Sequence, residues 1–175
     1  MPRYTTVFVW KCKNVFKKGL KIYITGRSEK ETEKMSVSFT TFDGFDFKMT
    51  RKCAKIIGRA LPYIENRNAD DDISIPLPEV GSIHMKKIVE FCKHYVTDPM
   101  NEIAKPLISN DICDCCITEF YRNFIEDYDI NEIALLLNSA NYMSIKPLVS
   151  LCGAKIALHI YGKTPEEIRE SFQKT

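Results

Sequence analysis

The sequence predicts an α+β fold in which a small sheet is flanked by helices. Strand patterns occur over 36–49 and 73–78, whereas the later apolar segments have the 3.6-residue period of helices. The chain has 175 residues, of which 45% are hydrophobic. This length suffices for one good core but not for two full domains.

Residues 36–49 have the pattern of a β-hairpin. A three-residue connection that ends at Gly44, with this glycine in the left-handed conformation, gives the most favourable register. Phe39 then faces Phe47, and one side of the strand pair is apolar.

A helix is predicted next, over 51–61, and Pro62 is expected to end it because proline lacks the N–H that a helix interior needs. The strand over 73–78 contains Pro76. Since Pro76 cannot donate to a strand ladder, this strand is expected at a sheet edge.

Three further helices are expected before the C-terminal region. The first spans 82–96, with Ser82 as its N-cap, and is clearly amphipathic. Two shorter helices are expected after residue 112, and the second of them spans 131–141.

The helix predicted over 144–161 has two apolar stripes and ends at Gly162. The first stripe comprises Ile145, Leu148, Val149, Cys152, Ile156 and Ile160. The second comprises Leu151, Ala154, Leu158 and Tyr161. A peripheral helix needs one stripe for its own core, so the second is expected to be covered by another polypeptide. The alternative is a helix enclosed by its own fold, which is the commoner situation for helices that are apolar all round.

A short final helix follows, with Thr164 as N-cap, Pro165 in its first turn and Glu167 completing a capping box. Isolated helices shorter than about 12 residues are marginal in water. Its apolar residues Ile168 and Phe172 therefore need a surface to pack against.

The charge is unevenly distributed. Residues 1–34 contain nine Lys or Arg against three Glu, although the whole chain has a formal charge of +2. A basic arm with interleaved aromatic residues suits nucleic acid, which is one functional alternative. Met35 begins a strand so abruptly that it is also a candidate start of the protein.

No catalytic constellation is legible. Cys113, Cys115 and Cys116, with His84 or His94, invite a zinc hypothesis, but structural zinc ligands are usually separated by two to four residues. We expect neither a metal nor a cofactor. The odd count of seven cysteines indicates a reducing compartment, and no apolar run is long enough to cross a bilayer. The protein is therefore expected to be soluble and intracellular.

Several segments together resemble the Skp family, the adaptors that link a cullin scaffold to F-box proteins in ubiquitin ligases. The segments are SIPLPEV at 74–80, VEFCKHY at 89–95, SANYMSIKPL at 139–148 and GKTPEEIR at 162–169. Elongin-C adaptors share the Ala-Asn-Tyr segment but lack the last of these motifs.

The resemblance implies a BTB/POZ fold with two projecting C-terminal helices. It implies a BTB/POZ domain over 35–143 and F-box-docking helices over 144–175, and the basic extension over 1–34 precedes them without a counterpart in the family. The expected partners are a cullin and F-box proteins. The free protein is expected to form a homodimer, and neither nucleic acid nor a membrane is expected as a partner. The expected location is cytoplasmic and nuclear.

The resemblance also implies two sets of site residues. The cullin-binding set is Asn141, Tyr142 and Tyr121. The F-box-binding set is Leu151, Ala154, Leu158, Tyr161, Pro165, Ile168 and Phe172. An elongin-C-like or self-associating BTB module is an alternative.

Three features depart from the family pattern. The family has a further acidic helix beyond Thr175, so weaker or narrower F-box binding is expected. Phe120-Tyr121 stands where the family usually has Trp. The loop over 97–112, which is acidic in many members, here contains Ile103, Leu107 and Ile108.

Overall fold

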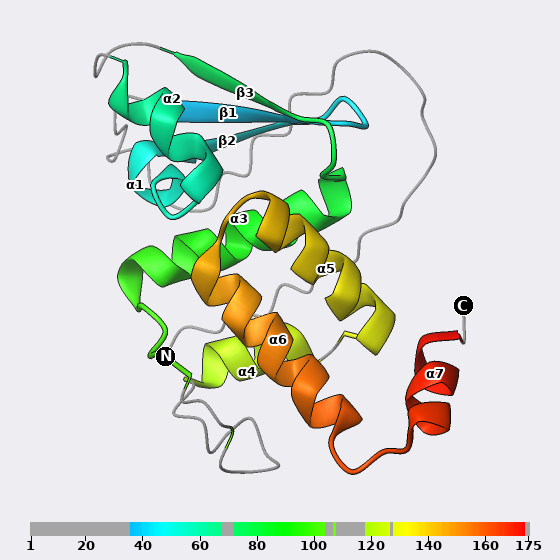
Figure 1. The fold of residues 1–175 in the computed structure, drawn as a ribbon. Coiled ribbons are helices and arrows are strands. Elements are labelled where there is room, and N and C mark those ends of the chain that lie inside the picture. Colours follow the sequence, from blue (N-terminus) through cyan, green and yellow to red (C-terminus); the bar gives the residue numbers. More distant parts are fainter. Residues whose placement is uncertain (1–35, 68–71, 104–106, 108–117, 127, 174–175) are drawn as a thin grey trace, which may run out of the picture.

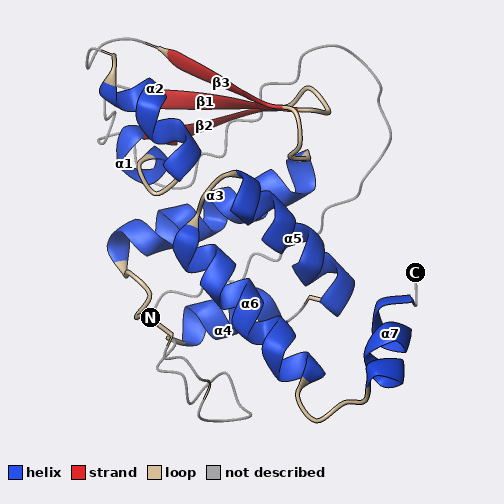
Figure 2. Cartoon of the chain, in the orientation of Figure 1, coloured by secondary structure: helices blue, strands red, loops and turns tan. Residues whose placement is uncertain are grey.

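The computed structural model describes residues 36–67, 72–103, 107, 118–126 and 128–173. The elements are β1 (Ser36–Thr41), β2 (Asp46–Thr50), α1 (Arg51–Ala54), η1 (Gly58–Ala60), α2 (Leu61–Glu65), β3 (Ile73–Leu77), α3 (Ser82–Thr97), α4 (Glu119–Glu126), α5 (Ile130–Tyr142), α6 (Lys146–Ile160) and α7 (Pro165–Gln173). The predicted α+β architecture is confirmed. The sheet lies at one end of the molecule with α1 and α2 beside it, and α3 to α6 form the other end (Figure 2). The predictions for 1–34, Met35 and the cysteines between 113 and 116 lie outside the described residues.

The sheet has the order β2-β1-β3, with β1 and β2 antiparallel and β1 and β3 parallel. Phe39 pairs with Phe47, and Gly44 has a φ of 79°, so the predicted hairpin register and turn are confirmed. β3 lies at an edge, where Pro76 pairs with Thr40. The edge position of this proline-containing strand is also confirmed.

Two helix boundaries differ from the prediction. Pro62 does not end a helix, because it lies in the first turn of α2, where a missing N–H is harmless. Ser82 is not the N-cap of α3 but its first residue. The carboxylate of Asp43, from the hairpin turn, accepts the Ser82 N–H at 3.2 Å from each oxygen. A residue 39 positions away thus supplies the cap that sequence reasoning assigned to Ser82.

The Asp43→Ala substitution is expected to lower the free energy of unfolding by about 1 kcal/mol at neutral pH, because α3 loses this cap. Burial of the Asp43 carboxylate raises its pKa, but hydrogen bonds from Ser82 and Thr41 outweigh burial and leave the pKa below its ordinary value. The stabilisation is therefore complete above the unfolded-state pKa and disappears as pH falls through the folded-state pKa. Urea unfolding of both proteins between pH 7 and pH 3 measures the difference. A difference at pH 3 as large as that at pH 7 would contradict this assignment.

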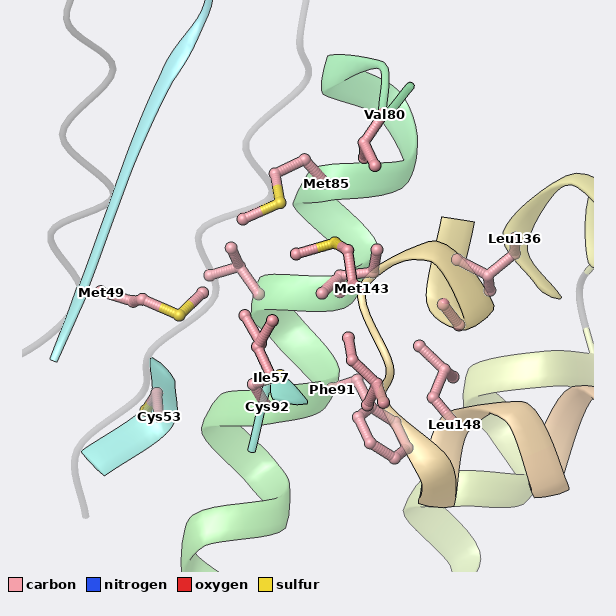
Figure 3. Close-up of a cluster of buried hydrophobic side chains, with 14 of the residues drawn as sticks. Met49, Cys53, Ile57, Val80, Met85, Phe91, Cys92, Leu136, Met143 and Leu148 are labelled. Carbon is pink, nitrogen blue, oxygen red and sulfur yellow. The ribbon is translucent and has the colours of Figure 1, made fainter. Parts of the chain in front are cut away.

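The buried side chains form one cluster around α3, as Figure 3 shows. Met49 and Cys53 lie on one side of α3, and Leu136 of α5 and Leu148 of α6 lie on the other. Phe91 of α3 is fully buried among them. The start of α6 is therefore part of the same core as the sheet. No helix in the described part of the chain is long and apolar enough to cross a membrane.

Candidate functional site

Helix α6 begins with a proline in its first turn and ends where Gly162 takes a φ of 72°. This left-handed residue turns the chain into α7. The capping box predicted for α7 is present, because the Thr164 N–H donates to the Glu167 carboxylate at 2.8 Å and the Glu167 N–H donates to the Thr164 hydroxyl at 3.3 Å. These two hydrogen bonds fix the start of α7 outside the core, at the periphery of the molecule (Figure 1).

The second apolar stripe of α6 is not uniformly open. Leu151 is completely buried in the protein's own core, so this conformation does not support its predicted role in F-box binding. Helix α5 packs against α6, and Leu151 belongs to the buried core cluster to which both helices contribute. Leu158 is half-buried, and Tyr161 is 70% exposed. The unpartnered part of the stripe is therefore its C-terminal end.

An apolar groove of about 420 Å³ lies along α6 on a side that the two-stripe pattern did not single out. It is lined by Ile103, Leu107, Leu137, Val149, Ser150, Gly153, Ala154 and Ala157. Ala154, which sequence reasoning placed in the docking set, is 5% exposed and contributes to this lining. A Cβ atom added to Gly153 would meet no other atom within 4 Å, so space is open directly above this residue.

The small residues Gly153 and Ala157, one turn apart on α6, are the sequence signal that would have predicted the groove. Small side chains at a spacing of four leave a depression along one helix face. Two of the apolar residues that distinguish the 97–112 loop, Ile103 and Leu107, form another wall of the groove. The departure of this loop from the family pattern thus has a structural consequence.

Helix α7 folds back toward the end of α6. The Phe172 ring lies edge-on to His159 with centroids 6.4 Å apart, and the Lys163 Nζ lies 3.0 Å from His159 Nε2. Burial and the positive charge of Lys163 together lower the pKa of His159. Ile168 is half-buried, whereas Pro165 is exposed. This helix therefore has the internal support that sequence reasoning required, while part of its surface stays open.

A second candidate face surrounds the turn between α5 and α6. Asn141 is exposed, and Tyr142 is half-buried beneath Arg59, whose guanidinium carbon lies 4.2 Å from the Tyr142 ring centroid. The Tyr142 hydroxyl is shielded from solvent and has no hydrogen-bond partner among the described residues. Leaving a buried hydroxyl unsatisfied costs about 1–3 kcal/mol of stability.

The burial of Tyr121 does not support its predicted role in cullin binding. Its side chain is completely buried, its hydroxyl donates to the Asp98 carbonyl, and its ring packs 5.6 Å from that of Phe91. Burial raises the pKa of Tyr121 to about 12. The neighbouring Phe120 is half-buried, and its ring stacks on that of His94 with the two ring centroids 3.6 Å apart. Of the two aromatic residues, Phe120 is the one near the surface.

The described thiols have no reactive character. Cys53, Cys92 and Cys152 are free and buried, and burial raises the pKa of both Cys92 and Cys152 to about 12. At neutral pH these two thiols stay protonated, and the thiol is a poor nucleophile. Within the described ranges, no group of three His, Cys, Asp or Glu side chains is placed to hold a metal ion.

Two family models match the chain. The Skp1 family tetramerisation domain matches residues 35–97, and the Skp1 family dimerisation domain matches residues 146–173. The first is a POZ-domain model, and it covers the sheet together with α1 to α3. The small sheet with its helices therefore has the BTB/POZ fold, that of a class of protein-interaction module.

Sequence relatives agree with these matches. The chain is 35% identical over 109 residues to an S-phase kinase-associated protein 1 homolog of Tetrahymena thermophila. It is 30% identical over 137 residues to the E3 ubiquitin ligase complex SCF subunit sconC of Neosartorya fischeri, and 31% identical over 144 residues to that of Arthroderma otae. The alignments cover 62%, 78% and 78% of this chain and 64%, 84% and 81% of the respective relatives. The chain thus spans just under two thirds of the Tetrahymena protein. It belongs to the Skp1 family.

Proposed function

We propose that this protein is a non-catalytic adaptor of a cullin-based SCF ubiquitin ligase, which links a cullin scaffold to F-box substrate receptors. Its relatives include proteins named as SCF subunits. The observation that supports the proposal best is the open apolar groove beside α6. It is accompanied by a second face at the end of α5, where Asn141 is exposed and Tyr142 is half-buried. The 15 residues of α6 correspond to about 22 Å of helix. Two polypeptides therefore have room to dock at once.

The groove and the exposed end of α6 are the F-box side of this proposal. Apolar side chains of an F-box helix enter the groove above Gly153 and pack along Leu158 and Tyr161. Each buried CH₂ group contributes about 0.8 kcal/mol, so two or three large side chains give substantial affinity. The walls are largely apolar, so their desolvation costs little.

The turn at Asn141 and Tyr142 is the cullin side. Tyrosine is a suitable interface anchor because it combines a rigid ring with a hydrogen-bonding hydroxyl at low entropic cost. The adaptor itself forms and breaks no covalent bond. It accelerates ubiquitin transfer by holding the substrate receptor near the rest of the ligase, which converts an encounter in solution into a reaction within one complex.

The open groove also favours self-association of the free protein. Tyr161 is 70% exposed, and a second copy of the chain would cover both this ring and the groove. F-box binding and self-association are then mutually exclusive. The buried free thiols suit the reducing cytoplasm and nucleus, where the proposal places the protein. Nucleic-acid binding through 1–34 remains an untested alternative.

The test is binding of two single-face variants to an F-box protein and to a cullin N-terminal domain. Leu158→Asp is expected to weaken F-box binding by roughly a hundredfold or more, because it buries an unpaired charge, and to spare cullin binding. Tyr142→Lys is expected to do the reverse. Isothermal titration calorimetry with each partner gives both affinities.

Thermal unfolding of both variants is the control for folding. Loss of both partners by one variant with an unchanged melting temperature would contradict the separation of the two faces. Failure of the wild-type protein to bind a cullin or an F-box protein would contradict the adaptor function itself. A salt-dependent RNA or DNA complex that disappears when 1–34 are deleted would favour the nucleic-acid alternative.

A further inference from the structure

Among the described residues, the Arg59 guanidinium has no acidic partner. Its side chain is exposed, and within the part of the chain that the structure describes it has neither a hydrogen bond nor an ion pair; its one side-chain interaction is with the Tyr142 ring. A guanidinium group has five N–H donors in a planar fork that matches the two oxygens of a carboxylate. Arg59 therefore presents an unused carboxylate-binding fork beside the Asn141-Tyr142 turn.

The backbone holds Arg59 in place beside this turn. The Arg59 N–H donates to the Met143 carbonyl at 3.2 Å, and the Gly58 N–H donates to the Ser144 carbonyl at 3.4 Å. Gly58 is required here because a Cβ atom would lie 2.9 Å from both the Cβ and the carbonyl oxygen of Ser144. These two hydrogen bonds join η1 to the turn between α5 and α6. The arginine is thus fixed relative to Tyr142 by main-chain contacts as well as by stacking.

Stacking on Tyr142 also prepares the guanidinium for binding. A cation over an aromatic ring is stabilised by the negative face of the ring, and the plane of the ring limits the positions of the group. Less side-chain entropy is then lost when a carboxylate binds. Two further cations, Lys55 and Lys146, are exposed within four residues of Arg59 and Tyr142, respectively, in the sequence. The local charge favours an acidic partner.

We propose that Arg59, stacked on Tyr142, is a carboxylate-binding site that receives an Asp or Glu side chain from the docked cullin. The inference rests on the proposed function, because it names a contact within the cullin face. Arg59 determines specificity at this face, since a partner without the acid leaves the guanidinium desolvated and unpaired. Tyr142 positions the fork by stacking beneath it.

The test measures the affinity of the full-length chain for a cullin N-terminal domain by isothermal titration calorimetry. Arg59→Glu is expected to weaken binding by roughly a hundredfold, because it sets two carboxylates against each other. Arg59→Gln is expected to weaken binding about tenfold. Arg59→Lys keeps the charge but loses the fork, and it is expected to recover only part of the loss. The wild-type affinity should fall with salt more steeply than that of Arg59→Gln.

Lys55→Glu is the matched control, because it makes the same charge change at an exposed residue four positions away, with no recorded contact to Tyr142. If Lys55→Glu weakened cullin binding as much as Arg59→Glu does, the effect would come from the overall charge of this region, and the proposal would be overturned. Wild-type affinity in Arg59→Glu or Arg59→Gln would also overturn it, while the proposed function would stand if Tyr142→Lys still abolished cullin binding. Absence of cullin binding by the wild-type protein would overturn both. F-box affinity should be unchanged in all four variants, and its loss would indicate misfolding and contradict the exposed placement of Arg59.

Discussion

Replacement of Gly153 by Leu is expected to reduce F-box affinity by roughly a hundredfold or more while cullin affinity stays within about twofold of wild type. A Cβ atom at this position meets nothing within 4 Å, so the new side chain enters the groove instead of clashing with the protein's own core. It then occupies the space lined by Ile103, Leu107 and Leu137 that the proposed partner needs. Calorimetric titration with an F-box protein measures the loss.

Gly153→Ala is the matched control for folding. Glycine in a helix interior is less favourable than alanine by about 0.5–1 kcal/mol, so this variant is expected to be more stable than wild type. Its single methyl group fills little of the groove and should reduce F-box affinity far less than Leu does. Normal F-box binding by Gly153→Leu would show that the groove is not the docking site, even if the adaptor function holds.

Replacement of Leu151 by Ala is expected to lower the free energy of unfolding by about 2–5 kcal/mol, because the side chain is completely buried and its loss leaves a cavity. Urea unfolding followed by circular dichroism measures the change. Each molecule that remains folded should bind an F-box protein with wild-type affinity, since Leu151 does not line the groove.

Leu158→Ala is the paired comparison, because this leucine lies two turns further along α6 and is only half-buried. It should cost about 1 kcal/mol of stability and weaken F-box binding. The opposite pattern, with a stable Leu151→Ala that cannot bind, would restore the sequence-based interpretation of Leu151 as a docking residue.

Local rules predicted the sheet well. The hairpin register follows from Gly44 and from the pairing of Phe39 with Phe47, which depend on a few neighbouring residues. The edge position of β3 follows from Pro76 alone. The cap of α3 was not predictable in the same way, because Asp43 reaches it from a turn 39 residues earlier in the chain.

The docking residues were harder to predict because periodicity does not define which stripe faces inward. Leu151 and Leu158 belong to the same helical stripe, yet Leu151 is completely buried and Leu158 is only half-buried. Similarly, Phe120 and Tyr121 are adjacent aromatic residues that point in different directions from α4, and their order gives no indication of which is buried. Tertiary packing of α5 and α3 decides both cases. Arg59 was missed because its partner, Tyr142, is 83 positions away.

The buried cysteines have a practical consequence for the study of conformational opening. Because the thiols of Cys92 and Cys152 are enclosed and protonated, an alkylating reagent reaches them only when the surrounding structure opens. Cys92 lies in α3 at the centre of the molecule, whereas Cys152 lies in α6. Peptide mapping by mass spectrometry would therefore give separate opening rates for the two helices. The native chain contains its own pair of probes for the order in which these helices detach.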